Sequence, residues 1–398
     1  MTVHFKNFSC SLHLIISSTA CQYFFCVLPR PKSRYFMYFC QFQRRKAMYK
    51  HLLKPILFSF NPETAHNMLF SLLSFLRHVP FARSVIRAIY KKESPSLSKE
   101  VFGLRFPNPV GLAGGLDKNG EFYNDMANFG FGFVEIGSLT PQPQDGNPKP
   151  RCFRVPGDKA IINRFGINNK GVKNAVEHLK RVRPEVIVAA NISKNTTSIN
   201  EDAAKDYETS FALLYDFVDM FVVNISCPNV VGLTALQDIS FLSDIVDRLL
   251  NLRMYYDNYR PILLKVSPDL SRSQLDEIID YSLRSGIDGI VAGNTTRSRD
   301  GLNSISAEKI EEIGNGGMSG APVHKKNLEL VRYVHEKSEG KLPIIGVGGI
   351  MSPEDAKEMI DAGASLVEIY TGFIYEGPAL IKRIIRHLES FQKSVKTK

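Results

Sequence analysis

Eight short apolar runs follow one another along the chain from residue 100 onward. They cover residues 110–114, 133–138, 186–192, 220–226, 262–267, 289–294, 344–349 and 366–372. Each run is continuous rather than alternating, which is typical of strands buried on both faces of a parallel sheet. Amphipathic stretches that predict helices lie between the runs, at 120–129, 171–182, 240–256, 271–285, 325–338 and 353–362.

Eight successive strand–helix units predict an α/β fold, and a closed (β/α)8 barrel accounts for their number better than an open sheet does. An open doubly wound sheet is the alternative. The glycines of GLAGGLDKNG at 111–120 do not have the spacing of a dinucleotide-binding fingerprint. The barrel is expected to occupy residues 93–398.

A helical hairpin is predicted over residues 48–92. Asn61-Pro62-Glu63 has the residue types of a helix start, and apolar residues follow at helical spacing as far as Val79. A second apolar stripe runs from Val85 to Tyr90, and lysines and arginines flank both stripes. The hairpin either packs on the body as an ordinary helical pair or lies with its apolar side on an anionic lipid surface.

The positive charge of the chain is concentrated at its beginning. The chain carries 50 Lys and Arg against 40 Asp and Glu, and its first acidic residue is Glu63. A nucleic-acid-binding protein would spread this excess over its folded face, so nucleic acid is not expected as a partner. Residues 1–47 show no pattern of secondary structure. They could be a transit peptide, a poor signal peptide, or an unstructured extension upstream of a true start at Met48. We favour the last interpretation.

Cysteine use and hydropathy limit the class of protein further. Four of the six cysteines lie within residues 1–47, which indicates a reduced, intracellular protein rather than a disulfide framework. No run of 18 apolar residues predicts a membrane-spanning helix. No group of His, Cys or Asp has the spacing of metal ligands, so no metal is expected.

Polar residues stand where the predicted strands end, which is where barrel enzymes carry their chemistry. Asn163, Asn224, Asn229 and Asn294 offer both donors and acceptors and suit a planar ligand with alternating N–H and C=O groups, such as a pyrimidine. The alternative is that each of these amides satisfies only its own loop. The glycines after the last two strands favour a phosphate site.

Two lysines and one cysteine are the candidates for charge stabilisation and catalysis. Lys118 and Lys265 follow the first and fifth strands. Three interpretations are open for each lysine. It could form a Schiff base, it could be a fixed positive charge beside a flavin or a substrate carboxylate, or it could be an ordinary surface lysine. Cys227 in NISCPN is placed to act as a general base, or it is a buried inert thiol.

The motifs together resemble those of one family. The chain is similar to class 2 dihydroorotate dehydrogenases, which are membrane-associated and reduce quinones. The likeness covers about residues 48–390 and rests on NPVGLAGGLDKNG, FGFVEIGSLTPQPQDGNPKPRCFR, INRFGINNKG, NISCPN, LLKVSPDL, GNTT, GGMSGAP, IIGVGGI and SLVEIYTGFIYEGP.

The resemblance implies an FMN-binding TIM barrel that oxidises dihydroorotate to orotate in pyrimidine biosynthesis. FMN would contact Gly114, Gly115, Lys118, Ser138, Asn191, Asn224, Lys265, Gly293, Gly320, Gly349, Tyr370 and Thr371. Dihydroorotate would be held by Lys118, Asn163, Gly166, Ile167, Asn224, Asn229, Asn294 and Thr295. The hairpin would admit the quinone along a tunnel near His66, Arg154 and Tyr370.

The resemblance also implies a mechanism, with one departure from the family pattern. Cys227 would remove a proton from the substrate, with Lys118 as the second catalytic residue, but class 2 enzymes normally carry Ser where this chain has Cys227. A soluble class 1 enzyme that uses fumarate or NAD is therefore the alternative. The expected location is the cytoplasmic face of a bacterial plasma membrane, as a peripheral protein, or else the mitochondrial inner membrane. A monomer is expected.

Overall fold

The computed structural model describes residues 48–226 and 238–396. The chain divides into two units at Ser59 and Phe60. The first unit contains the π-helix η2 (Met48–Leu53) and α3 (Lys54–Ser59), where Leu52, Leu53 and Ile56 are exposed. The second unit contains everything described below, including the helices α4 and α5 of the predicted hairpin.

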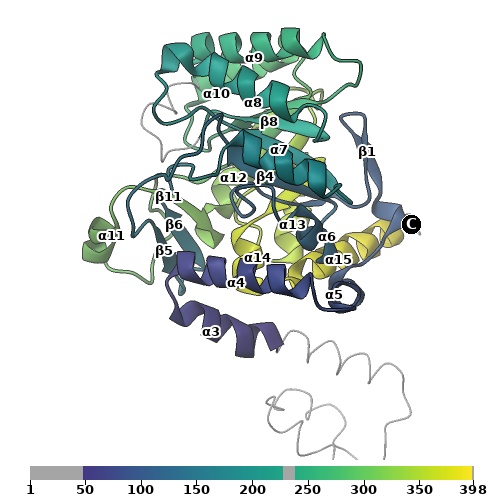
Figure 1. Cartoon of the computed structure of the whole chain (residues 1–398), viewed down its shortest axis with the longest axis vertical. Coiled ribbons are helices and arrows are strands. Elements are labelled where there is room, and N and C mark those ends of the chain that lie inside the picture. Colours follow the sequence, from purple (N-terminus) through teal and green to yellow (C-terminus); the bar gives the residue numbers. More distant parts are fainter. Residues whose placement is uncertain (1–47, 227–237, 397–398) are drawn as a thin grey trace, which may run out of the picture. The chain divides into compact units, whose positions relative to one another are not determined.

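Eight parallel strands close into a barrel, which confirms the predicted fold (Figure 1). The strands are β3 (Val110–Leu112), β4 (Phe133–Leu139), β7 (Ile187–Ile192), β8 (Met220–Asn224), β9 (Ile262–Val266), β10 (Gly289–Ala292), β12 (Ile344–Val347) and β13 (Leu366–Ile369). They pair in chain order, and β13 pairs with β3 to close the ring. The closed ring excludes the open sheet that the apolar runs alone left possible.

The predicted helices cover the barrel, together with others that the pattern did not single out. The predicted ones are α6 (Tyr123–Asn128), α7 (Val172–Arg181), α9 (Ile239–Arg253), α10 (Arg272–Ser285), α12 (His324–Lys337) and α13 (Pro353–Asp361). The additional ones are α8 (Ala203–Leu214), α11 (Ala307–Ile313), α14 (Thr371–Glu376) and α15 (Ala379–Lys396). The main hydrophobic core lies between the strands and these helices.

Two small sheets lie at the two ends of the barrel. The hairpin of β1 (Lys99–Val101) and β2 (Leu104–Phe106) places Phe106 edge-on to Phe133, at the start of β4, and so covers the amino-terminal end of the strands. The antiparallel sheet of β5 (Cys152–Val155), β6 (Ala160–Asn163) and β11 (Gly317–Gly320) is built from the loops that follow β4 and β10. Those loops leave the carboxyl ends of the strands, where the candidate residues were expected.

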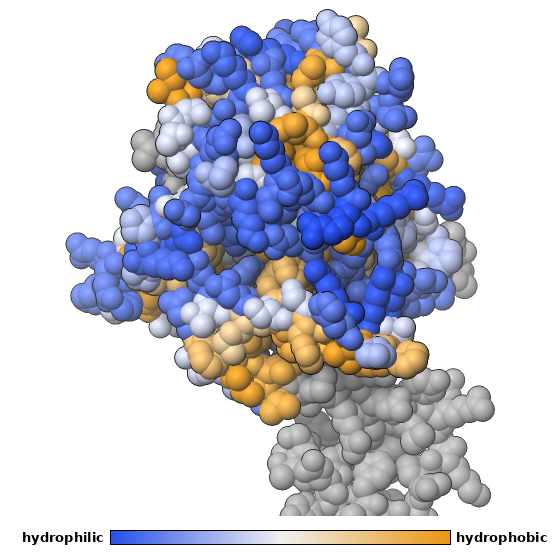
Figure 2. All heavy atoms as spheres, in the orientation of Figure 1, coloured by the Kyte–Doolittle hydropathy of each residue, from blue (hydrophilic) through white to orange (hydrophobic). Residues whose placement is uncertain are grey.

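The helices α4 (Pro62–Leu76) and α5 (Ala82–Tyr90) pack on the barrel unit. Asn61 caps α4, because its side chain accepts a hydrogen bond from the Glu63 backbone N–H, and Pro62 takes the first helical position. The helix ends at Leu76 and not at Val79, where the apolar stripe ends. One side of the pair stays apolar and exposed, as Figure 2 shows, and it carries Phe60, Met68, Leu72, Phe75, Val79, Phe81 and Val85.

Candidate active site

One pocket opens at the carboxyl ends of the barrel strands, and most of the predicted site residues line it. These are Gly114, Gly115, Lys118, Ser138, Asn163, Gly166, Ile167, Asn191, Asn224, Lys265, Asn294, Thr295, Gly320, Gly349, Tyr370 and Thr371. They come from strands and loops spread over more than 250 residues of sequence, and they meet because parallel strands bring their carboxyl ends to one face. His66, Arg154 and Gly293 are not among the lining residues. Cys227 and Asn229 lie outside the described residues.

A buried ion cluster forms the floor of the pocket. Lys265 Nζ lies 2.8 Å from Glu135 Oε1 and 3.7 Å from Glu368 Oε2. The side chains of both glutamates are fully buried, and that of Lys265 is 6% exposed. Burial by itself would lower the pKa of Lys265, but the two carboxyl groups outweigh burial and raise it. Lys265 is therefore a fixed cation, and the two glutamates are site residues that sequence reasoning missed.

The asparagine amides are held in place by their neighbours. Asn191 Nδ2 donates to Glu135 Oε1 at 2.6 Å, and Asn224 Nδ2 donates to Ser138 Oγ at 2.8 Å. Asn294 Nδ2 donates to Ser226 Oγ at 2.8 Å, which ties the loop after β10 to the end of the β8 segment. These contacts fix which face each amide presents. The buried Asn191 Oδ1 has no hydrogen-bond partner among the described residues, so an acceptor is left over in the pocket.

Lys118 is a second cation with a different environment. Its ammonium group donates to the Gly115 carbonyl at 2.8 Å and lies 4.5 Å from the centre of the Phe165 ring. Burial lowers the pKa of Lys118 to about 8. No carboxylate within the described ranges forms an ion pair with Lys118. Its charge is consequently available to an anionic ligand.

Glycines shape the pocket at two ends. A Cβ on Gly114 would lie 2.3 Å from Glu135 Oε1, so only glycine lets this loop approach the ion cluster. Gly348 and Gly349, in the loop after β12, both have positive φ, which favours glycine. Beside them Thr371 Oγ1 lies 2.8 Å from Ser319 Oγ. Backbone N–H groups and hydroxyls thus gather at this end, as a phosphate site requires.

Of the residues expected along a tunnel, His66 lies on α4 and Arg154 on β5. His66 stacks on Phe70 with ring centroids 4.2 Å apart, and burial followed by the charge of Lys118 lowers its pKa to about 3. Burial raises the pKa of the Cys152 thiol to about 11, which disfavours its reactive thiolate form. Arg154 donates to the Phe60 carbonyl at 2.9 Å. Of the three tunnel residues, only Tyr370 lines the pocket itself.

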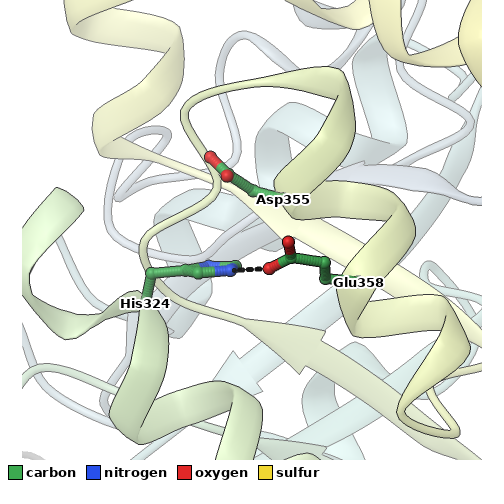
Figure 3. Close-up of side chains that lie close together, drawn as sticks. All are labelled: His324, Asp355 and Glu358. Atoms are coloured by element: carbon green, nitrogen blue, oxygen red, sulfur yellow. Dashed lines mark hydrogen bonds and ion pairs between the residues drawn. The ribbon is translucent and has the colours of Figure 1, made fainter.

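A further group of side chains, His324, Asp355 and Glu358, could offer ligands to a metal ion (Figure 3). Its members already have structural roles. His324 on α12 is hydrogen-bonded to Glu358 on α13 at 3.0 Å. Asp355 accepts from the backbone N–H groups of Met351 and Ser352 and so caps α13. These contacts explain the arrangement as a link between two helices.

Comparisons with known proteins agree with this geometry. The profile of a family described as dihydroorotate dehydrogenase matches residues 96–391. Two similar proteins are named dihydroorotate dehydrogenase (quinone). The one from Christiangramia forsetii is 47% identical over 337 residues, which are 85% of this chain and 97% of that protein. The one from Cellvibrio japonicus is 43% identical over 350 residues, which are 87% of this chain and 99% of that protein. Two crystal structures of DHODH from Eimeria tenella are similar, each 33% identical over 84% of this chain. The complex with ferulenol has a TM-score of 0.75 and the ligand-free form 0.76, with 93% and 96% of those chains covered.

Proposed function

The chain belongs to the dihydroorotate dehydrogenase family, and we infer that it oxidises dihydroorotate to orotate with a quinone as the electron acceptor. The observation that supports this function best is the single pocket, where asparagine amides, two lysines and a glycine-lined end meet at the carboxyl ends of the barrel strands. The family is flavin-dependent in general. The soluble alternative, which would use fumarate or NAD, is less well supported, because the similar proteins named above carry the word quinone in their names.

We propose FMN as the flavin, and the residues present suit it. The unpartnered Asn191 Oδ1 offers an acceptor to a ring N–H, and the loops with Gly320, Gly349 and Thr371 offer backbone N–H groups and a hydroxyl to one phosphate. The chemistry that a bound flavin supplies is reversible two-electron acceptance. Lys265 supplies positive charge on the pocket floor, where it stabilises negative charge on the ring system. The remaining predicted contacts that line the pocket are Gly114, Gly115, Lys118, Ser138, Asn224 and Tyr370, whereas Gly293 is not among the lining residues.

We propose that the amide ring holds the substrate. Asn163, Asn224 and Asn294 are fixed by their neighbours, so they can present donors and acceptors to the ring amides of dihydroorotate without reorganising. Asn229, Thr295, Gly166 and Ile167 complete the predicted set. Lys118, which forms no ion pair with a described carboxylate, would pair with the substrate carboxylate.

Cys227 remains our proposed general base. The proposal is supported by Ser226, the residue before Cys227, which is hydrogen-bonded to Asn224 and Asn294, two residues that line the pocket. The base would take the proton from C5 of dihydroorotate as hydride leaves C6. Replacement Cys227→Ala is expected to lower kcat by about 10²–10⁴-fold. Cys227→Ser, which restores the residue usual in class 2, should recover part of the loss, and an unchanged kcat in Cys227→Ala would exclude the assignment.

We propose that the exposed apolar side of α4 and α5 lies on the membrane from which the quinone arrives. Within the described residues no helix has both the length and the apolar character required to cross a bilayer. The flanking cations are largely engaged, because Arg77 pairs with Asp125, and Arg83 and Arg87 both pair with Glu185. The apolar side chains would therefore contribute more to membrane affinity than attraction to anionic lipid does. An exposed apolar surface of this kind is what we expect of a peripheral membrane protein. We propose that it lies on the cytoplasmic face of a bacterial plasma membrane, with the mitochondrial inner membrane as the alternative.

The membrane proposal is tested by vesicle flotation. Leu72→Gln combined with Phe75→Gln should reduce binding to both neutral and anionic vesicles, whereas Leu283→Gln, an exposed apolar residue on α10, should leave binding unchanged. Equal binding of all three proteins would exclude this surface.

The reaction itself is tested by mixing the purified protein with dihydroorotate under anaerobic conditions. Dihydroorotate should bleach the flavin absorbance, and a quinone added afterwards should restore it. Restoration by fumarate or NAD and not by the quinone would favour the soluble alternative. A flavin that dihydroorotate cannot bleach would exclude the proposed substrate.

A further inference from the structure

Three ionisable side chains from three different strands meet inside the barrel. Glu135 comes from β4, Lys265 from β9 and Glu368 from β13, and the ammonium group lies within 4 Å of both carboxyl groups. Lys265 and Glu368 also line the pocket proposed above for the flavin. The charge state of this triad therefore sets part of the electrostatic environment of that pocket.

The triad holds one more acid than base. If both glutamates were ionised, a net negative charge would remain in a site from which water is excluded, and such a charge is strongly disfavoured. Among the described residues, no other ionisable side chain pairs with the triad: β12 and β3, which pair with β13, consist of Ile-Ile-Gly-Val and Val-Gly-Leu, and Asn191 on β7 is neutral. One proton held by the two carboxyl groups removes the imbalance.

The contacts identify which glutamate holds the proton. Glu135 accepts hydrogen bonds from Lys265 at 2.8 Å and from Asn191 at 2.6 Å, so its negative charge is stabilised. Both oxygens of Glu368, and the second oxygen of Glu135, lack a hydrogen-bond partner within the described part of the chain. A proton on Glu368 turns one of these oxygens into a donor, and Glu135 offers the unpartnered acceptor.

The directions of the pKa shifts agree with this placement. Burial and then the charge of Glu135 raise the pKa of Glu368 well above its ordinary value. Burial would also raise the pKa of Glu135, but the ion pair with Lys265 and the hydrogen bonds to its carboxylate hold the pKa below its ordinary value.

We propose that Glu368 is a positioning residue, held as a neutral carboxylic acid that donates to Glu135 and keeps the Glu135–Lys265 pair balanced at the floor of the flavin pocket. Its influence on the flavin rests on the proposed function. Loss of the proton at alkaline pH leaves the floor with a net negative charge, which opposes reduction of a bound flavin. Glu368→Gln fixes the neutral state, because the amide is the same size and keeps one donor.

The protonation state is tested by infrared spectroscopy of the purified protein, with no substrate added. At pH 7 the wild-type protein should show the C=O stretch of a protonated carboxylic acid that Glu368→Gln lacks. Glu135→Gln should also lack it, because a single remaining glutamate ionises beside Lys265. Glu376→Gln is the matched control: this buried glutamate pairs with Lys159 at 3.0 Å and Arg383 at 3.4 Å, so its removal should leave the band intact.

Two infrared outcomes would overturn the proposal. A band of full intensity in Glu368→Gln would assign the proton elsewhere. A band that persists in Glu135→Gln would show that burial alone, and not the neighbouring carboxylate, keeps Glu368 neutral. If Glu368→Gln does not fold, the wild-type and Glu135→Gln spectra still decide the question. Because these spectra need no turnover, they hold or fail whether or not dihydroorotate bleaches the flavin.

The effect on the flavin is tested by measuring its reduction potential against pH. The wild-type and Glu368→Gln potentials should coincide at pH 7 and diverge at alkaline pH, where only the wild-type pocket gains a negative charge and its potential falls below that of the variant. A potential in Glu368→Gln that is already higher at pH 7 would mean that Glu368 is ionised there and would refute the proposal. Glu376→Gln should follow the wild-type curve throughout.

Discussion

His66 should make the fold sensitive to acid. Its imidazole stacks on Phe70 under α4, and burial followed by the charge of Lys118 lowers its pKa from 6.5 to about 3. In the unfolded chain the same ring titrates near 6.5. The folded protein therefore keeps His66 neutral over a range of pH where the unfolded chain takes up a proton.

The sign and size of the effect follow from linkage between proton binding and folding. Because the pKa is lower in the folded state, the stabilising contribution is complete above pH 6.5 and is lost as pH falls toward 3. Between pH 7 and pH 5 the loss is about 2 kcal/mol, and below pH 3 it reaches about 4–5 kcal/mol. A loss of this size is a substantial fraction of the stability of an ordinary domain.

The assay is urea unfolding of the wild type and His66→Phe at pH 7 and pH 5. Phenylalanine keeps the ring stack on Phe70 and removes the titrating group, so the variant should lose about 2 kcal/mol less than the wild type on acidification. Asp117, whose pKa burial raises to about 6, gains stability over the same range in both proteins, so only the difference between them is informative. His78→Gln, at an exposed position just beyond α4, should behave like the wild type. Equal losses in His66→Phe and the wild type would refute the argument.

Three further predictions concern the pocket. Gly114→Ala should abolish flavin retention, measured by absorbance after gel filtration, because the added Cβ would lie 2.3 Å from Glu135 Oε1. Lys265→Ala should lower the free energy of unfolding in urea by about 3–5 kcal/mol, since it leaves buried carboxyl groups without their cation. The KM for dihydroorotate should rise as pH increases past 8, because Lys118 then loses its proton, whereas Lys118→Met should show a high KM that does not change over this range.

The fold could be predicted because parallel barrel strands are apolar on both faces. All eight apolar runs proved to be barrel strands, and most observed strands end one to three residues before the runs do. The difference arises because the last residues of a run, such as Gly114 and Asn294, leave the strand to enter the site. The helix α8 was not singled out, since its buried side includes the polar Ser210 and the hydroxyl-bearing Tyr207, which interrupt an apolar stripe.

The site could be predicted where strand order alone brings residues together. Lys118 and Asn294 follow two different strands and Lys265 lies near the end of a third, and all three line one pocket, as the barrel requires. The carboxyl groups of Glu135 and Glu368 were missed, because a charge inside an apolar run shows neither which way it points nor what it meets. A signal was nevertheless present: the strands FVEIGSL, ILLKV and LVEI each carry one ionisable residue among apolar ones, and buried charges rarely occur unless they are paired.

The two lysines of the pocket differ in what surrounds them, and this difference separates their roles. Lys265 lies between the ionised Glu135 and Glu368, which we propose to be neutral, so its charge is balanced within the protein before any ligand binds. Lys118 has a carbonyl and an aromatic ring as its neighbours, and neither neutralises it. Because its charge is balanced, Lys265 can contact a permanent cofactor without attracting other anions. Lys118 has a pKa of about 8, and a ligand with its own negative charge would stabilise its charged form. This difference supports the proposal that the substrate carboxylate pairs with Lys118 and that the flavin ring lies against Lys265.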